Sequence, residues 1–215
     1  MPDPNYRWVA TVVEAVAPPG DNALARRSFG HNERMALLPA HLDAGALALN
    51  RLTPGHVDEM VAAASVSFSA LHEWMTWAEG VPTRADFADF IDAAGSLFDN
   101  DMTWTFAMIE LLSGELVGSC DVRVVSDTTD VEIGYWVRTD RTRRGYASAA
   151  AKALTDAAFL HLDVNRVIIR MDKGNAASAS VPPKIGYRLL GEEARTIEAP
   201  GHTGTELIWM QVRAT

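Results

Sequence analysis

The chain has 215 residues and a formal net charge of −9, and 48% of its residues are hydrophobic. This length and composition suit one globular domain with a sizeable core and exclude an intrinsically disordered chain. The negative charge disfavours nucleic acid as a partner, because binding to phosphates depends on a positive field. An acidic surface suits a cationic acceptor such as an amine, and it also aids solubility.

Three features predict a cytoplasmic protein that does not bind a membrane. Cys120 is the single cysteine, so no intramolecular disulfide can form, and we expect it to be a small buried hydrophobe rather than a nucleophile. No apolar run approaches the roughly 20 residues of a membrane helix. Residues 1–5 lack the basic start and apolar stretch of a signal peptide. The sequence leaves a monomer and a homodimer open.

The N-terminal fifth of the chain differs from the rest. Residues 6–16 can form a strand, and the Pro-Pro-Gly-Asp-Asn run at 18–22 predicts a turn. We expect residues 1–45 to be an N-terminal extension packed on a main domain of residues 46–215. Residues 46–52 then alternate between apolar and polar side chains and predict a strand.

Two helices are expected next. Thr53 and Pro54 suit the cap and first position of a helix that runs to about Phe68. The aromatic-rich residues 71–77 suit a separate short helical turn. The run Thr83-Arg84-Ala85-Asp86 resembles a capping box and begins a helix whose apolar face holds Phe87, Phe90, Ile91, Ala94 and Leu97.

The remainder predicts an antiparallel meander followed by a β-α-β unit, and thus a mixed α/β fold. The expected strands are residues 103–111, 116–125, 131–137, 166–171, 187–196 and 205–212. An alanine-rich helix is expected over 145–162, and a short helix over 175–185.

The junction between the third meander strand and the alanine-rich helix predicts an anion site. The first turn of a helix leaves its N–H groups unpaired, and the helix dipole adds positive potential there. Gly145 and Ala147 allow close approach to the backbone, and Arg143 and Arg144 add charge. A pyrophosphate fits such a site. Arg-Arg-Gly also occurs in solvated turns, but its place between a strand and a helix favours the anion site.

These residues resemble the acetyl-CoA-binding signature of the GNAT superfamily of N-acetyltransferases, Gln/Arg-x-x-Gly-x-Gly/Ala. Thr142 stands where the signature prefers Gln or Arg. Downstream, Asn175-Ala176-Ala177-Ser178 and Lys184-Ile185-Gly186-Tyr187 are similar to the branch that contains the ribosomal-protein alanine N-acetyltransferases, as is the aromatic segment 71–78. The resemblance spans about residues 46–213.

The resemblance implies a central, largely antiparallel, splayed sheet of six to seven strands flanked by helices. It implies transfer of an acetyl group from acetyl-CoA to a primary amine, of a protein N-terminus or a small molecule, by direct attack on the thioester. A catalytically silent acyl-CoA-binding module and a transferase using a larger donor such as succinyl-CoA remain alternatives. A Rossmann-type nucleotide binder is disfavoured, because no Gly-x-Gly-x-x-Gly run follows the first strand.

The resemblance also implies catalytic roles. Ser178 would donate a proton to the departing sulfur, because Pro182 stands where many members carry a tyrosine. A helix cap is an equal alternative for Ser178. Glu132, on the central strand, could take the amine proton through water. Glu198 is a second candidate base, for which a solvated carboxylate is the favoured interpretation.

The remaining implied sites are for binding. Trp74, Trp77 and His72 are candidate walls of the acceptor pocket, although Trp104 is expected in the core and a surface position suits His72. His202 and Thr203 are expected to lie in a plain loop. The six histidines show no metal-ligand spacing, so no metal is expected. Implied contacts to acetyl-CoA come from Tyr135, Trp136, Val137, Arg138, Arg143, Arg144, Gly145, Tyr146, Ala147, Ser148, Asn175 and Ser178.

Overall fold

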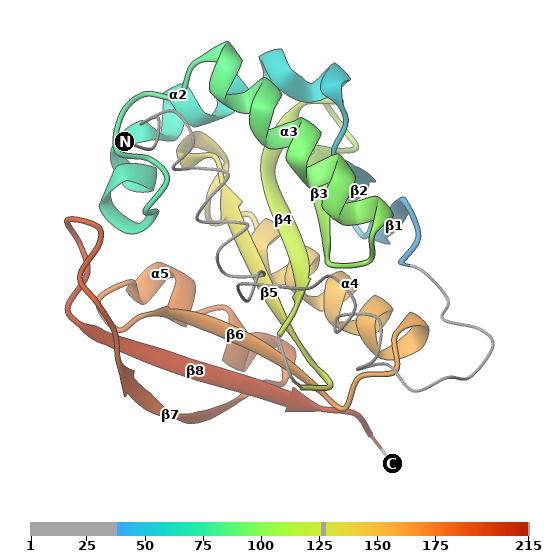
Figure 1. Ribbon diagram of the computed structural model, residues 1–215, viewed down its shortest axis with the longest axis vertical. Coiled ribbons are helices and arrows are strands. Elements are labelled where there is room, and N and C mark those ends of the chain that lie inside the picture. Colours follow the sequence, from blue (N-terminus) through green and yellow to red (C-terminus); the bar gives the residue numbers. More distant parts are fainter. Residues whose placement is uncertain (1–37, 126–127, 215) are drawn as a thin grey trace, which may run out of the picture.

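A single eight-stranded sheet organises the chain in a computed structural model, which describes residues 38–125 and 128–214 (Figure 1). The strand order is β1-β2-β3-β4-β5-β6-β8-β7, and only β5 and β6 pair in parallel. The strands are β1 (His41–Ala44), β2 (Leu47–Arg51), β3 (Thr103–Glu110), β4 (Leu116–Val124), β5 (Asp130–Val137), β6 (Arg166–Asp172), β7 (Arg188–Ala194) and β8 (Thr205–Val212).

The predicted fold class is therefore confirmed, with one strand more than the six to seven expected. The additional strand is β1, which pairs with β2 in a hairpin and lies within the region expected to form the extension. This strand has four residues and one buried side chain, so its hydrophobic pattern is too short to predict a strand from sequence. The strand expected at residues 6–16 lies outside the described residues.

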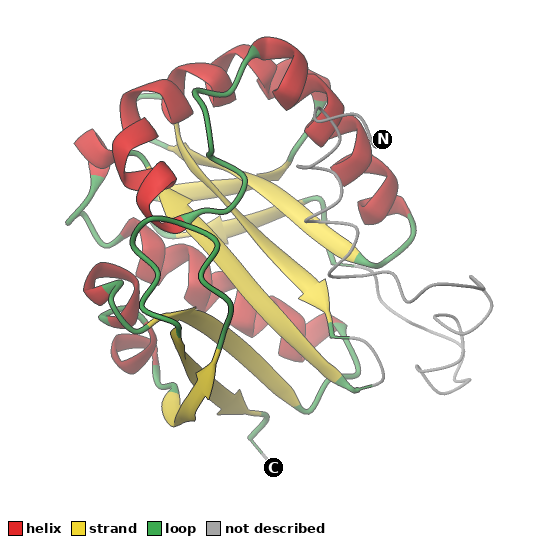
Figure 2. Cartoon of the chain, turned by 60° about the vertical axis from the view of Figure 1, so that its left-hand side comes forward, coloured by secondary structure: helices red, strands yellow, loops and turns green. Residues whose placement is uncertain are grey.

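Helices cover both faces of the sheet (Figure 2). Two long helices, α2 and α3, pack on one face, and α4 packs on the other. None of the helices in the described ranges is long and apolar enough to cross a membrane. The helices are η3 (Pro54–His56), α2 (Val57–Trp74), α3 (Arg84–Asp99), η4 (Thr139–Arg141), α4 (Tyr146–His161), α5 (Ala176–Ala179) and η5 (Pro182–Ile185).

Local signals explain where α3 begins, but not where α2 ends. The capping box is confirmed, since the Asp86 N–H donates to Thr83 Oγ1 (3.2 Å) and the Thr83 N–H donates to Asp86 Oδ2 (2.7 Å). The separate turn expected at residues 71–77 was wrong. The helix continues to Trp74 because Ser67 and Leu71 keep its buried stripe in contact with the core.

The predicted short helix at 175–185 is divided in two. The four-residue α5 ends before Val181, and a 3₁₀ turn, η5, begins at Pro182. Pro182 and the following proline lack the N–H groups that a continuous helix needs. This division leaves the α5 side chains beside β5 rather than within a longer helix.

The core on the α4 face holds the residues expected to be structural. Trp104 and Cys120 are each 1% exposed and pack beneath α4, and burial raises the pKa of the Cys120 thiol well above its usual range. Both predictions are confirmed.

The sheet opens between its two parallel strands. β5 pairs with β6 only from Asp130 to Glu132, and the rest of β5 pairs with β4 alone. Beyond Glu132 the two strands diverge (Figure 1). The unpaired edge of β5 therefore faces a wedge-shaped opening, as the resemblance implied.

Candidate functional site

Two cavities meet at this opening. The first, called here the cradle cavity, has a volume of about 400 Å³ and lies between α2, the N-terminus of α4 and the α5–η5 segment. The second, called the charged cavity, has a volume of about 610 Å³ and lies over β4, β5, β6 and β8. Six side chains line both: Trp74, Met75, Tyr135, Trp136, Asn175 and Ser178.

The cradle cavity contains the predicted anion site. Its wall includes Arg143, Gly145, Tyr146, Ala147 and Ser148, at the start of α4. Arg143 and Gly145 adopt positive φ values of 62° and 82°, a left-handed conformation that costs little for glycine. The turn directs the open end of α4 at the cavity, where unpaired N–H groups and the helix dipole favour an anion.

The expected basic residues of this loop face different partners. Arg143 lines the cradle cavity, whereas the Arg144 guanidinium pairs with Glu110 of β3 at 3.2 Å. Arg138 pairs with Asp140 at 2.9 Å, outside both cavity walls. Lys184, which the sequence analysis did not assign, adds a cation to the opposite wall.

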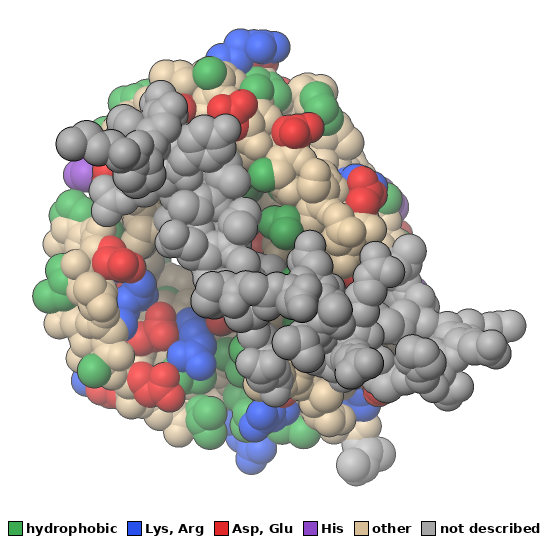
Figure 3. Space-filling model, in the orientation of Figure 1, with side chains coloured by type: hydrophobic (Ala, Val, Ile, Leu, Met, Phe, Trp, Pro, Cys, Tyr) green, Lys and Arg blue, Asp and Glu red, His purple; other side chains and the backbone are tan. Residues whose placement is uncertain are grey.

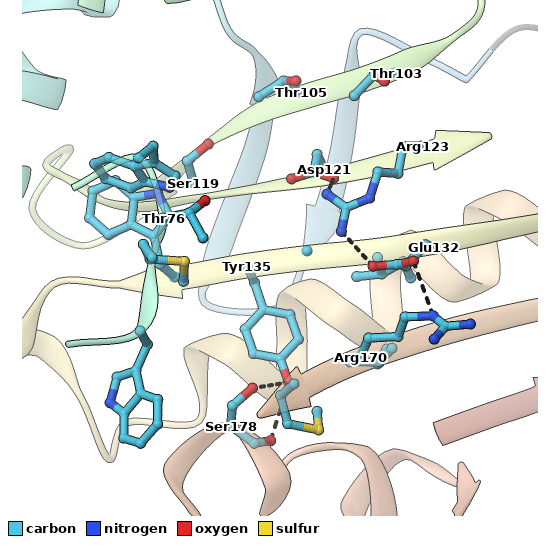
Figure 4. Close-up of a pocket in the computed structure, with 18 of the residues that line it drawn as sticks. Thr76, Thr103, Thr105, Ser119, Asp121, Arg123, Glu132, Tyr135, Arg170 and Ser178 are labelled. Carbon is cyan, nitrogen blue, oxygen red and sulfur yellow. Dashed lines mark hydrogen bonds and ion pairs between the residues drawn. The ribbon is translucent and has the colours of Figure 1, made fainter. Parts of the chain in front are cut away.

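Asn175, Ser178 and Tyr135 lie where the two cavities meet. Asn175 caps α5, because its Oδ1 accepts the Ser178 N–H at 3.0 Å. The Ser178 hydroxyl donates to the Tyr135 hydroxyl at 3.4 Å, and Tyr135 donates to the Ser178 carbonyl at the same distance (Figure 4). Ser178 is thus not the helix cap that the sequence left as an alternative, and its hydroxyl faces the opening.

Burial dominates the electrostatics of this pair. It raises the pKa of Tyr135 to about 12, although the hydrogen bond with Ser178 opposes the rise. Tyr135 therefore keeps its proton throughout the physiological range. The pair can donate a proton to an atom placed at the junction of the cavities.

A chain of ion pairs crosses the floor of the charged cavity. Arg123 contacts Asp121 at 3.4 Å and Glu132 at 2.5 Å, and Arg170 contacts Glu132 at 3.5 Å (Figure 4). Arg170 also contacts Glu206 at 3.1 Å. Acidic and basic side chains also lie next to one another at the lower left of the space-filling view (Figure 3). Glu132, the candidate base from sequence, lies in this cavity with both carboxylate oxygens engaged.

Aromatic side chains form the other end of the charged cavity. Trp77 packs against Trp136 and Phe87 with ring centroids 6.4 Å apart in each case. Trp74 and Trp77, the candidate walls of the acceptor pocket, both line this cavity. His72 does not. It stacks on Phe68 and its Nδ1 lies 2.8 Å from the Ala78 carbonyl oxygen.

The loop at residues 199–204 is more than the plain connection that was expected. His202 is 7% exposed, and its Nε2 lies 3.2 Å from the Trp74 carbonyl oxygen while its Nδ1 accepts the Glu198 N–H at 3.2 Å. The Gly201 N–H donates to the Glu73 carbonyl at 2.8 Å. This loop is thus fastened to the end of α2, and Glu198 lies outside both cavity walls.

Sequence reasoning missed most of the charged cavity. Asp121, Arg123, Arg170, Arg195 and Glu206 line it and were not assigned. Charged residues two apart within an otherwise buried strand, as in Asp121-Val122-Arg123, were the available signal. Within the described ranges, no three His, Cys, Asp or Glu side chains cluster as metal ligands do.

Comparison with known proteins bears on this geometry. The model of the acetyltransferase (GNAT) domain matches residues 46–188. YdaF of Bacillus subtilis (strain 168), provisionally named a ribosomal N-acetyltransferase, is 35% identical over 78 residues, which are 36% of this chain and 43% of YdaF. The chain thus matches less than half the length of this curated relative.

Two solved structures share the fold. The microcin C7 self-immunity acetyltransferase MccE, in complex with acetyl-CoA and AMP, aligns with a TM-score of 0.75 at 16% identity, covering 84% of this chain and 100% of MccE. The ribosomal L7/L12 alpha-N-protein acetyltransferase RimL, in complex with CoA, aligns with a TM-score of 0.74 at 16% identity. The alignment covers 80% of this chain and 97% of RimL.

Proposed function

This chain belongs to the GNAT acetyltransferase family, and we propose that it transfers an acetyl group from acetyl-CoA to a primary amine. The meeting of the two cavities at Tyr135, Asn175 and Ser178 carries the proposal. One cavity ends at an anion site and the other at a cluster of charges. A donor and an acceptor can therefore reach the same point, each through its own cavity.

The cradle cavity suits acetyl-CoA, which would supply the activated acyl group as a thioester. The N–H groups at the start of α4 would hold the pyrophosphate, with Arg143 as the charged side chain beside them. Asn175 would contact the pantetheine arm. Arg138 and Arg144, which the sequence also assigned to this role, are engaged by carboxylates in this arrangement.

At the junction, Ser178 would donate a proton to the departing sulfur and Tyr135 would support it. Each hydroxyl proton lies in a hydrogen bond of the pair, so the Ser178 hydroxyl would turn from Tyr135 to the sulfur as the thiolate leaves. A proton donor at the leaving group lowers the barrier by general acid catalysis. A carboxylate of the charged cavity would take the proton that the amine releases, and Glu132 is the one expected from sequence.

The acceptor would be a protein N-terminus or a small-molecule amine. The names of YdaF and RimL point to ribosomal proteins, and the name of MccE points to self-immunity toward microcin C7. A cavity of about 610 Å³ suits a small molecule or the first residues of a peptide.

The test combines calorimetry with a search for products. The purified chain is titrated with acetyl-CoA, free CoA and succinyl-CoA, and then incubated with acetyl-CoA and a panel of short peptides and small amines. Micromolar binding and a mass increase of one acetyl group on an amine are expected. Binding without turnover would indicate a catalytically silent acyl-CoA-binding module. A preference for succinyl-CoA would indicate a transferase that uses a larger acyl donor. Absence of binding by a folded sample would overturn the proposal.

A further inference from the structure

The two carboxylates bridged by Arg123 differ in how firmly they are held. Glu132 places one oxygen on Arg123 at 2.5 Å and the other on Arg170 at 3.5 Å. Asp121 has one oxygen on Arg123, at the longer distance of 3.4 Å. Glu132 thus pairs with two guanidiniums, whereas Asp121 pairs with one and accepts the backbone N–H of Gly134.

The second oxygen of Asp121 lies over the edge strand of the opening. In the β4–β5 register Asp121 faces Gly134, and a Cβ atom at position 134 would come within 2.8 Å of Asp121 Oδ2. The lack of a side chain at Gly134 thus makes room for this carboxylate against β5. Tyr135, at the junction of the cavities, is the next residue along that strand.

Asp121 is partly buried, but its side chain can be reached from the charged cavity. About 26% of its side chain is exposed, and it lines the charged cavity, so an acceptor or a water can reach it. Thr105 of β3 faces it in register, and the neighbouring Thr103 hydroxyl is buried without a hydrogen-bond partner in the described part of the chain. These hydroxyls can hold a water between Asp121 and an amine.

The electrostatic balance favours uptake of a proton. Burial raises the pKa of Asp121, and the negative charge of Glu132 adds to the rise, whereas Arg123 and the Gly134 amide oppose it. The raised pKa makes this carboxylate a stronger base than an exposed aspartate.

From this geometry we infer that Asp121, rather than Glu132, accepts the proton of the acceptor amine, directly or through one water. The inference rests on the proposed function. Asp121 first takes one proton from the acceptor ammonium, which frees the lone pair of the nitrogen. The nitrogen then bonds to the thioester carbon and releases its second proton to water, while the carbon–sulfur bond breaks and the Ser178–Tyr135 pair protonates the sulfur. An amide and the CoA thiol result, and the side chains re-equilibrate with solvent.

Substitution of Asp121 tests the inference. D121N keeps the shape of the side chain and is expected to lower kcat at least about 100-fold, with acetyl-CoA binding unchanged by calorimetry. D101N is the matched control, because burial also raises the pKa of Asp101 but it lies outside both cavities. Its kcat is expected to equal that of the unmodified chain.

A change of nucleophile separates proton transfer from positioning. With hydroxylamine, which is neutral at the assay pH, the loss in D121N should be smaller than with an alkyl ammonium acceptor. An equal loss with both would overturn the inference in favour of a positioning role. If D121N does not fold, G134A displaces the same carboxylate and should give the same dependence on the nucleophile.

The outcomes distinguish this inference from the proposed function. Full activity of D121N in an enzyme that acetylates amines would overturn the role of Asp121 alone. If the unmodified chain binds acetyl-CoA and acetylates no amine of the panel, the proposed function and this inference fail together.

Discussion

Two adjacent arginines before α4 make different contacts, and this difference can be measured. Arg143 lines the cradle cavity, whereas Arg144 is held by Glu110. R143A should weaken acetyl-CoA binding about tenfold, because a charge-assisted contact to the pyrophosphate is lost. R144A should change the affinity less than about threefold. Calorimetric titration of both variants with acetyl-CoA makes the comparison.

Free CoA and dephospho-CoA serve as controls for the Arg143 prediction. R143A should weaken binding of both ligands equally if Arg143 contacts the pyrophosphate. A loss seen only with CoA would place Arg143 at the ribose phosphate instead. Equal effects of R143A and R144A would contradict the assignment from the cavity wall.

Tyr135 provides a second prediction at this scale. Y135F removes the hydroxyl that lies 3.4 Å from Ser178 Oγ and should lower kcat about 10- to 100-fold, with little change in the KM for acetyl-CoA. Because burial raises the Tyr135 pKa to about 12, its deprotonation should not produce an alkaline fall in kcat below about pH 10. The pH profiles of the two proteins check both points.

At the scale of elements, local sequence signals predicted beginnings better than ends. Thr83 and Asp86 define the start of α3 because four consecutive residues contain the complete capping interaction. The end of α2 could not be placed in this way. Its last turn is stabilised by the burial of Leu71 and by contacts to the distant loop at residues 199–204, which are tertiary.

That distant loop depends on Asp172, the last residue of β6. Asp172 accepts the N–H groups of Gly174 (2.8 Å) and Thr203 (2.9 Å) and the Thr203 hydroxyl (2.9 Å). D172N should lower the free energy of unfolding by about 1–3 kcal/mol, because one acceptor becomes a donor that faces N–H groups. D156N, at an exposed pair with Lys152, is the control and should change it by less than about 0.5 kcal/mol.

The Asp172 carboxylate should also make the stability of the fold depend on pH. Burial alone would raise the Asp172 pKa, but the hydrogen bonds from Gly174 and Thr203 and the charge of His202 together lower it. Its contribution is therefore complete above the pKa of the unfolded chain and is lost as the pH falls through the lower, folded pKa. The free energy of unfolding, measured with urea, should fall less between about pH 7 and pH 3 in D172N than in the unmodified chain. An unchanged acid loss would contradict this account.

At the scale of the whole molecule, the two cavities differ in how far sequence could predict them. An anion site beside the cradle cavity could be proposed from sequence because its residues lie within one continuous segment, from Arg143 to Ser148. The charged cavity draws on β4, β5, β6 and β8, and its ion pairs form only once the strand register is fixed. Of the charged residues in that cavity, Glu132 was the one assigned from sequence, since it belongs to the strand next to the signature.

The charge of the whole chain predicts which acceptors react fastest. The net charge is −9, and the charged cavity is lined by four carboxylates and three guanidiniums: Asp121, Glu132, Asp172, Glu206, Arg123, Arg170 and Arg195. A cationic acceptor is therefore attracted both at long range and within the cavity. A peptide with an N-terminal alanine followed by lysines should show a several-fold higher kcat/KM than a glutamate peptide of equal length.

Salt separates this attraction from specific contacts. Raising KCl from about 0.1 M to 1 M shortens the Debye length from about 10 Å to 3 Å, so the advantage of the lysine peptide in kcat/KM should largely disappear. The kcat values of the two peptides should stay similar, because the reacting groups are the same. A preference for the glutamate peptide at low salt would show instead that Arg170 and Arg195 select an anionic acceptor. A preference for lysine that persists in 1 M KCl would indicate direct contacts with the cavity carboxylates.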